Sequence, residues 1–232
     1  MNWDKKLLGD TKWSSDIINY DQKMSVAKNI AEKVKEGDVI GFGSGSTSFL
    51  AVHEIAKHIE ENHLKIFAIP TSHEIELTCI KLGIQVLSIN SARPDWSFDG
   101  ADEVDPYGNL IKGRGGAMYN EKLIMKCSKE SFILVDESKI VSSLGSNFRV
   151  PIEIIPNSLM YVKQCLFDLG ASESMLRLAK SKDGPVITEN GNYILDVKFM
   201  TITDKTETAI KGITGVVESG LFWGYSVTVV RI

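Results

Sequence analysis

The chain of 232 residues carries 26 basic and 30 acidic side chains, and its net charge of -4 argues against a nucleic-acid-binding protein, which would show a strongly basic face. Hydrophobic residues make up 43% and charged residues 24%, the balance of a globular protein with a large core in one or two domains. No apolar run is long enough to span a membrane, and the polar N-terminus lacks a signal-peptide pattern, so a cytoplasmic protein is expected. Cys79, Cys127 and Cys165 lie far apart and are expected to be reduced thiols.

Helices and strands alternate in the first part of the chain. Apolar residues at helical spacing predict helices, and short apolar runs bounded by turn residues predict strands. Helices are expected over residues 14–35, 46–61 and 73–82, and strands over 38–42, 64–70, 84–89, 96–98 and 131–135. This alternation predicts an α/β fold with an open, mostly parallel, Rossmann-like sheet that has helices on both faces.

The turn between the first strand and the helix at 46–61 is rich in glycine and serine. It contains Ser44, Gly45, Ser46 and Thr47. The unpaired N–H groups and the dipole at a helix N-terminus favour an anion, and the hydroxyl groups can add donors. The turn lacks the third glycine of a dinucleotide-binding loop and the lysine of a Walker loop. We therefore expect a site for a single phosphate, with a serine-capped turn that binds nothing as the alternative.

Several other polar residues of this part are expected to be structural. His53, His58 and His63 recur every five residues, which spreads them around a helix, so they are expected to be surface residues and no metal site is predicted. Ser72 is expected to cap the helix that begins at His73.

An acidic segment follows the predicted strand at 96–98. Asp99 and Asp102 flank Gly100 and Ala101, two small residues that let a ligand approach the backbone. Two carboxylates so close in sequence are expected to titrate as a coupled pair.

A lysine and a glutamate follow within twenty residues. Lys112 opens a loop with Gly113, Arg114 and Gly115, and Glu121 lies early in the next predicted helix. Carboxylates, an ammonium group and a glycine-rich backbone are the groups needed to move protons on a small polar substrate. From these residues alone, a solvated acidic turn followed by an ordinary glycine-rich loop is the alternative.

Three polar clusters are expected at one edge of the sheet. The turn at 44–47, the acidic segment at 99–102 and Lys139 each follow the carboxyl end of a predicted strand. The carboxyl ends of parallel strands share one edge, where α/β proteins usually bind their ligands. The three clusters are therefore expected to form one site.

The pattern changes after Gly145. Strands are expected over 149–155, 175–179, 186–189, 193–199, 216–222 and 227–232, and helices over 158–169 and 204–211. Asn190-Gly191 predicts a hairpin turn. We expect a small α+β domain over residues 146–212 and an α/β catalytic domain over 1–145 and 213–232. Arg177 lies in the small domain and is expected to form a surface ion pair, with contact to a phosphate as the alternative.

Taken together, the motifs resemble those of ribose-5-phosphate isomerase of the A type. The matching segments follow in order and spacing over nearly the whole chain: 43–47, 99–103, 112–117, 121–122, 136–139, 151–153 and 188–192. Arg114 departs from the family pattern, which usually has glycine there, so substrate fit at this position is expected to differ.

The resemblance implies an aldose–ketose isomerase that interconverts D-ribose 5-phosphate and D-ribulose 5-phosphate through an enediolate, in the non-oxidative pentose phosphate pathway. It implies that Glu121 is the base, that Asp99, Asp102 and Lys112 line the reacting end of the sugar, and that Lys139 binds substrate. The expected substrate-binding set also includes Ser44, Gly45, Ser46, Thr47, Gly100, Ala101, Gly113, Arg114 and Gly115. We expect no cofactor, no metal and no binding to nucleic acid or membranes. We expect the protein to form a homodimer or homotetramer.

Other functions remain open from the residues. Amino-sugar phosphate deaminase-isomerases and lactonases share the phosphate-binding turn, and coenzyme A transferases of similar architecture use a glutamate as nucleophile. A sugar-phosphate-sensing regulator would usually carry a basic DNA-binding segment, which is not visible. The incomplete glycine pattern argues against a nucleotide-binding protein.

Overall fold

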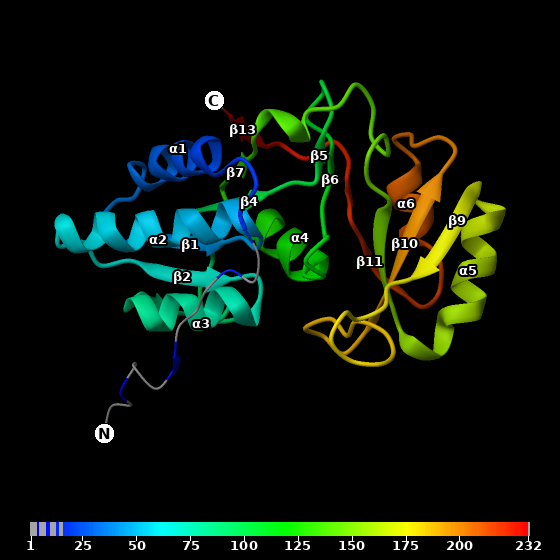
Figure 1. The fold of residues 1–232 in the computed structure, drawn as a ribbon, viewed down its shortest axis with the longest axis horizontal. Helices are drawn as coiled ribbons and strands as arrows, with labels where there is room; N and C mark the ends of the chain where they lie inside the picture. The colour runs from blue at the N-terminus through cyan, green and yellow to red at the C-terminus, as the bar shows by residue number, and fades with distance from the viewer. Residues whose placement is uncertain (1–3, 5–7, 10–12, 14–15, 232) are drawn as a thin grey trace. The chain divides into compact units, whose positions relative to one another are not determined.

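The computed structural model describes residues 4, 8, 9, 13 and 16–231 (Figure 1). Within them, two compact units are distinguished, one from residues of 1–100, 123–137 and 226–232 and the other from 101–122 and 138–225. The predicted domains, 1–145 with 213–232 and 146–212, have other boundaries and stay a prediction. No helix in the described chain is long and apolar enough to cross a membrane.

The first unit is built on a parallel sheet. Among the described residues, six strands form it in the order β13-β7-β4-β1-β2-β3, and all neighbours pair in parallel. The strands are β1 (Val39–Phe42), β2 (Phe67–Pro70), β3 (Gln85–Val86), β4 (Trp96–Gly100), β7 (Glu130–Leu134) and β13 (Thr228–Val230). The predicted α/β fold is confirmed, and β13 pairs in parallel with β7 of this sheet.

Helices cover both faces of this sheet. They are α1 (Tyr20–Ala31), α2 (Ser46–Glu61), α3 (His73–Leu82) and α4 (Met118–Cys127), the last of which begins in the second unit and ends in the first. Phe42 packs with α1 and α2 on one face. Gly41 points to the opposite face, where an added Cβ would overlap Ile124 of α4.

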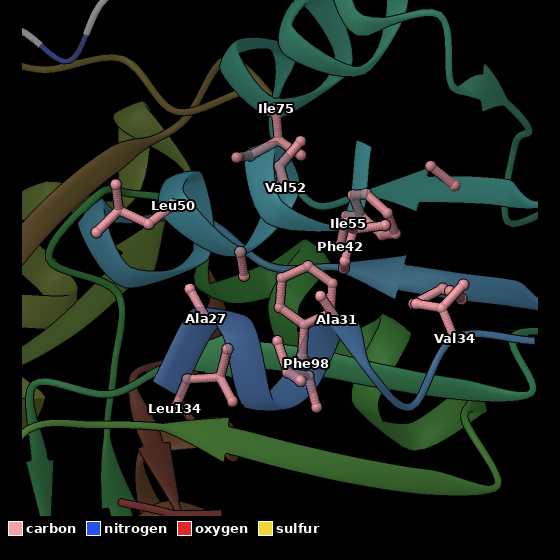
Figure 2. Packing of buried hydrophobic residues seen from close by; sticks show 14 of the residues in the cluster. Ala27, Ala31, Val34, Phe42, Leu50, Val52, Ile55, Ile75, Phe98 and Leu134 are labelled. Atoms are coloured by element: carbon pink, nitrogen blue, oxygen red, sulfur yellow. The ribbon is translucent and has the colours of Figure 1, made fainter. Parts of the chain in front are cut away.

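The core of the first unit lies between the sheet and the helices α1 and α2. Figure 2 shows Ala27 and Ala31 of α1 beside Phe42 and Phe98 of the sheet. The two phenylalanine rings have centroids 5.0 Å apart. Each fully buried large side chain stabilises the fold by about 1.5–3 kcal/mol, so this core holds β1 and β4 in place beside each other.

The second unit contains two antiparallel sheets. The larger has the order β11-β8-β10-β9 and the smaller β12-β6-β5. Their strands are β5 (Glu103–Val104), β6 (Leu110–Ile111), β8 (Val150–Ile154), β9 (Ala171–Leu176), β10 (Tyr193–Phe199), β11 (Val216–Ser219) and β12 (Leu221–Phe222), with helices α5 (Leu159–Asp168) and α6 (Thr206–Lys211) and 3-10 turns η2 (Glu137–Lys139) and η3 (Pro156–Ser158). The smaller α+β part of the fold is thus confirmed.

Several expected elements differ in the structure, among them the strand expected at 175–179, which lies at Ala171–Leu176 instead. The first helix begins only after Asn19, whose φ of 57° is left-handed, and residues 14 and 15 lie outside the described residues. Residues 186–189 are not a strand, although Asn190-Gly191 does form a turn, and β10 pairs with β8 and β9 instead. The expected strand at 216–222 is divided at Gly220 into β11 of one sheet and β12 of the other. An added Cβ at Gly220 would overlap the Lys112 carbonyl oxygen, so the close approach at this point requires glycine.

Candidate active site

The turn at 44–47 leaves the N-terminus of α2 open to an anion. Gly45 begins the helix with φ 99°, a left-handed value that favours glycine, and provides no side-chain cap. The first N–H groups of a helix have no intrahelical partner, and in α2 no acidic side chain lies in the first turn. Ser46 is partly exposed here while Thr47 is buried. This geometry fits the predicted phosphate site.

A buried lysine from α1 reaches the same helix end. The Lys23 side chain is 9% exposed, and its Nζ donates to Ser46 Oγ at 3.0 Å. Asp136, which follows β7, holds this ammonium with its Oδ2 3.8 Å from Nζ, and Asn19 Nδ2 donates to its Oδ1 at 3.0 Å. Lys23 was not predicted, although it shares the buried helix face of Ala27 and Ile30, a signal that a buried lysine has a partner.

Ser44 joins the turn to the end of β2. Its hydroxyl lies 2.7 Å from Thr71 Oγ1 and donates to Ser72 Oγ at 2.8 Å. Ser72 in turn accepts the N–H of Ile75 at 3.4 Å, so it caps α3 as predicted. Gly83, with φ 83°, ends that helix, also as predicted.

Asp99 is buried at the carboxyl end of β4 and fixed by backbone donors. Its Oδ1 accepts the N–H of Ser44 at 3.1 Å and the N–H of Gly100 at 2.7 Å. Gly43 makes this approach possible, because an added Cβ there would lie within 2.5 Å of Asp99 Cα. The turn at 44–47 and the first predicted carboxylate are therefore brought together within the first unit.

Asp102 and the glycine-rich loop meet within the second unit. The N–H of Arg114 donates to Asp102 Oδ2 at 3.1 Å, and the N–H of Asp102 donates to the Ile111 carbonyl at 2.8 Å. Burial raises the pKa of the Asp102 carboxyl above its ordinary value, and the positive charges of Lys112 and Lys139 oppose this shift only in part. Asp102 therefore takes up a proton more readily than an ordinary aspartate.

Lys112 and Glu121 form a buried ion pair. Lys112 Nζ lies 3.4 Å from Glu121 Oε2, and the two side chains are only 3% and 4% exposed. Lys112 follows β6 directly and its N–H donates to Gly220 O, whereas Glu121 lies in the first turn of α4. Two secondary-structure elements thus fix an ammonium and a carboxylate beside each other in a dry environment, where electrostatic interactions are strong.

The next residue of α4 has a structural role. Lys122 is 2% exposed, and its Nζ donates to Glu207 at 2.6 Å, to Glu218 at 3.0 Å and to Leu221 O at 2.7 Å. These bonds satisfy all three protons of the ammonium group. Lys122 therefore anchors the start of α4, which carries Glu121.

Arg114 and Lys139 share an aromatic neighbour. The Arg114 guanidinium lies 5.8 Å and Lys139 Nζ 5.0 Å from the centroid of the Phe148 ring. Glu103, fully buried, holds this segment by accepting the N–H groups of Asn147 and Phe148 at 2.5 and 2.8 Å. The carboxylate of Glu103 therefore stabilises the loop under the two cations.

The predicted site residues thus fall into two sets. Ser44–Thr47, Asp99 and Gly100 belong to the first unit, and Ala101, Asp102, Lys112–Gly115, Glu121 and Lys139 to the second. That both sets act on one ligand stays a prediction. Among the described residues, no group of three or more His, Cys, Asp and Glu could hold a metal ion.

His53 differs from the sequence expectation. It is half-buried on α2, its ring centroid lies 4.6 Å from that of Phe49, and burial lowers its pKa. It is therefore a packed histidine rather than a surface residue.

Comparison with known proteins identifies the family. The sequence profile described as ribose 5-phosphate isomerase A (phosphoriboisomerase A) matches residues 67–231. The chain belongs to the ribose 5-phosphate isomerase A family. It is 44% identical to the ribose-5-phosphate isomerase A of Methanocaldococcus jannaschii over 209 residues, which cover 89% of this chain and 92% of that relative.

Solved structures agree with membership of the ribose 5-phosphate isomerase A family. The structure of ribose 5-phosphate isomerase A from M. jannaschii superposes with a TM-score of 0.86 at 42% identity, over 90% of this chain and 92% of that one. A D-ribose-5-phosphate isomerase in complex with phospho-erythronic acid also gives a TM-score of 0.86, at 36% identity over 90% and 95% of the two chains.

Proposed function

We propose that this chain interconverts D-ribose 5-phosphate and D-ribulose 5-phosphate through an enediolate, with Glu121 as the base. The observation that carries the proposal is the buried pair of Glu121 and Lys112, in a chain of this family. A carboxylate that removes a proton from carbon needs a positive partner for the charge that develops on the neighbouring oxygen. An ammonium group 3.4 Å from the carboxylate is suited to that task.

In this proposal the phosphate of the substrate binds at the N-terminus of α2. Its oxygens would accept N–H groups and hydroxyls of Ser46 and Thr47, and the Lys23 ammonium beside Ser46 would neutralise part of the charge. Binding energy from this remote group holds the reacting carbons in register with the base.

The furanose ring must open before isomerisation. Ring opening requires an acid that gives a proton to the ring oxygen and a base that accepts the proton of the anomeric hydroxyl. The raised pKa of Asp102 suits it to the acid role. Oδ1 of Asp99 already accepts two backbone N–H groups, so the carboxylate is oriented to act as an acceptor.

The proton transfer then runs in two steps. Glu121 takes the proton from C2 of the open aldose, the electron pair forms the C1–C2 double bond, and the aldehyde oxygen becomes negative. Lys112 and N–H groups of the loop at 113–116 stabilise this oxygen. Glu121 returns the proton to C1, the C2 hydroxyl loses its proton to the C1 oxygen, and the C2 carbonyl forms.

The relative bound to phospho-erythronic acid supports the substrate class. That ligand combines a phosphate with a carboxylate at the other end. The carboxylate has the negative charge and planar shape expected of an enediolate, so a site that binds both groups suits the proposed intermediate. We also propose that the protein is cytoplasmic and forms a homodimer or homotetramer. Light scattering on the purified protein would test its oligomeric state.

The direct test is an assay with D-ribose 5-phosphate in the presence of a chelator, in which the ketose product is followed by its absorbance. The wild-type protein should form D-ribulose 5-phosphate. Glu121→Gln should bind substrate but lose roughly 10²–10⁴-fold in kcat, the usual contribution of a positioned base. Near-normal turnover by this variant would refute the assignment of the base.

A further inference from the structure

Arg177 does more than form the surface ion pair expected from the sequence. It follows β9 directly, and its Nε donates to Asp196 Oδ2 of β10 at 2.8 Å, while Nη2 bonds to Oδ1 of the same carboxylate. The two side chains are 17% and 26% exposed. This two-point contact fixes the plane of the guanidinium group.

The third nitrogen of the same guanidinium contacts the candidate catalytic loop. Nη1 donates to the carbonyl oxygen of Gly113 at 3.1 Å and to that of Arg114 at 2.8 Å. The loop is also closed by the N–H of Gly116, which donates to the Gly113 carbonyl at 3.0 Å. The carbonyl groups of two successive residues, Gly113 and Arg114, are therefore both held by Nη1 of Arg177.

Anchoring the carbonyls determines where the N–H groups point. In a planar trans peptide the C=O of one residue and the N–H of the next point in opposite directions. With the carbonyls of Gly113 and Arg114 on Arg177, the N–H groups of Arg114 and Gly115 are directed to the other side. The N–H of Arg114 meets Asp102 Oδ2 there, as this argument requires. Successive N–H groups on one side form an anion-binding arrangement.

We propose that Arg177, held by Asp196, is a positioning residue: through the two carbonyls it directs the N–H of Arg114 to Asp102 and the N–H of Gly115 toward the oxygen on which charge develops. The proposal rests on the isomerase function proposed above. Arg177 itself does not touch the substrate in this account. Its removal should therefore reduce kcat and leave KM nearly unchanged, because the donors it orients matter most in the transition state.

A second arginine in the same unit provides a matched control. Arg149 forms an ion pair with Glu173 on the same sheet, and its side chain is 42% exposed. Within the described part of the chain, Arg149 forms its hydrogen bond and ion pair with Glu173 and none with the loop at 112–116. A role limited to bridging two strands would therefore be shared by both arginines, whereas a role in positioning the loop belongs to Arg177 alone.

The experiment compares Arg177→Met, Arg177→Lys, Asp196→Asn and Arg149→Met in kcat, in KM for D-ribose 5-phosphate and in backbone hydrogen exchange of residues 113–117. We expect Arg177→Met to lose roughly 10- to 100-fold in kcat, with KM within about threefold of wild type and faster exchange in the loop, because a misplaced group can cost about 10²-fold. Arg177→Lys should not restore kcat, since an ammonium lacks the planar guanidinium fork that bonds both oxygens of Asp196 through two nitrogens and the loop carbonyls through the third. Arg149→Met should match wild type.

The proposal is overturned if Arg177→Met keeps a kcat within about twofold of wild type, or if only its KM rises, which would make Arg177 a substrate-binding residue. If Arg177→Met does not fold, Arg177→Lys and Asp196→Asn decide by the same criteria. Hydrogen exchange needs no turnover. Wild-type protein without isomerase activity would refute the proposed function, whereas unchanged exchange of the loop in the Arg177 variants would refute the positioning role.

Discussion

Lys23 is a buried charged residue on α1 beside the start of α2, where we propose that phosphate binds. It is buried on α1 between Ser46 and Asp136, which lie 23 and 113 residues away in sequence. A lysine is rarely buried unless it is paired, and the Asp136 carboxylate provides the pairing charge. The side of the ammonium that faces Ser46 is the part suited to a phosphate.

Lys23→Met should therefore weaken substrate binding more than turnover. Loss of one charge-assisted hydrogen bond of about 1.5–3 kcal/mol corresponds to a rise in KM of roughly 10- to 100-fold. Steady-state kinetics with D-ribose 5-phosphate would measure it. Lys28→Met, on the exposed face of the same helix, is the control and should leave KM unchanged. A normal KM in Lys23→Met would remove Lys23 from the phosphate site.

Lys112→Ala should mainly lower kcat. In the proposed reaction its ammonium stabilises the enediolate oxygen, and removal of one such donor typically costs about 10²–10³-fold. The exposed Lys126 on α4 provides a control, Lys126→Ala, that should keep wild-type kinetics. A change in KM alone would show that Lys112 acts on the ground state.

The raised pKa of Asp102 predicts a pH-dependent cost to stability. The folded protein holds the Asp102 proton more tightly than the unfolded chain does, so stability falls as pH rises through the window between the two pKa values. Asp102→Asn should therefore have a higher free energy of unfolding than wild type at neutral pH. The gain should vanish below about pH 4, where the unfolded aspartate is also protonated. Urea unfolding at both pH values would test this, and an equal gain at both would contradict it.

At the scale of elements, the contact between β1 and β4 determines where the turn at 44–47 and Asp99 meet. Gly43 leaves room for the Asp99 backbone and carboxylate, so a larger residue would push the two strand ends apart. Gly43→Ala should destabilise the protein by about 1–3 kcal/mol, the usual cost of overpacking, and lower activity as well. Gly212→Ala is the control, because its added Cβ meets nothing nearer than 3.4 Å. Thermal unfolding would compare them, and equal melting temperatures would contradict this account.

Local patterns predicted some element boundaries and missed others. Gly45 and Ser46 predict the start of α2, and Gly83 predicts the end of α3. Gly45 and Gly83 both have left-handed φ values, which favour glycine at these helix ends. Ile18 lies within the helix expected over 14–35, yet it precedes the start of α1 and is 76% exposed. The segment at 186–189 looked like a strand, but Thr188 donates to buried Glu153 at 2.7 Å, a distant partner that a local pattern cannot reveal.

For the whole molecule, the parallel sheet and the smaller antiparallel part were predictable from the alternation of helices and strands and its change after Gly145. The contacts between the charged side chains of the candidate site were predictable only in part. Lys112 and Glu121 lie nine residues apart and were expected to act together. The roles of Lys23 and Arg177 depend on contacts between residues 23 and 136 and between 114 and 177, and such distances in sequence carry no periodic signal.

The central claim is that the Glu121 carboxylate moves a proton between two adjacent carbons of a sugar phosphate. The most direct test follows conversion of D-ribose 5-phosphate in D2O by nuclear magnetic resonance, with wild-type protein and Glu121→Gln. Wild-type protein should form D-ribulose 5-phosphate, with deuterium at C1 in those turnovers in which the protonated Glu121 exchanges with solvent before it returns its proton. The variant should lose product and label together by roughly 10²-fold or more. Formation of labelled product by Glu121→Gln at the wild-type rate would contradict the claim.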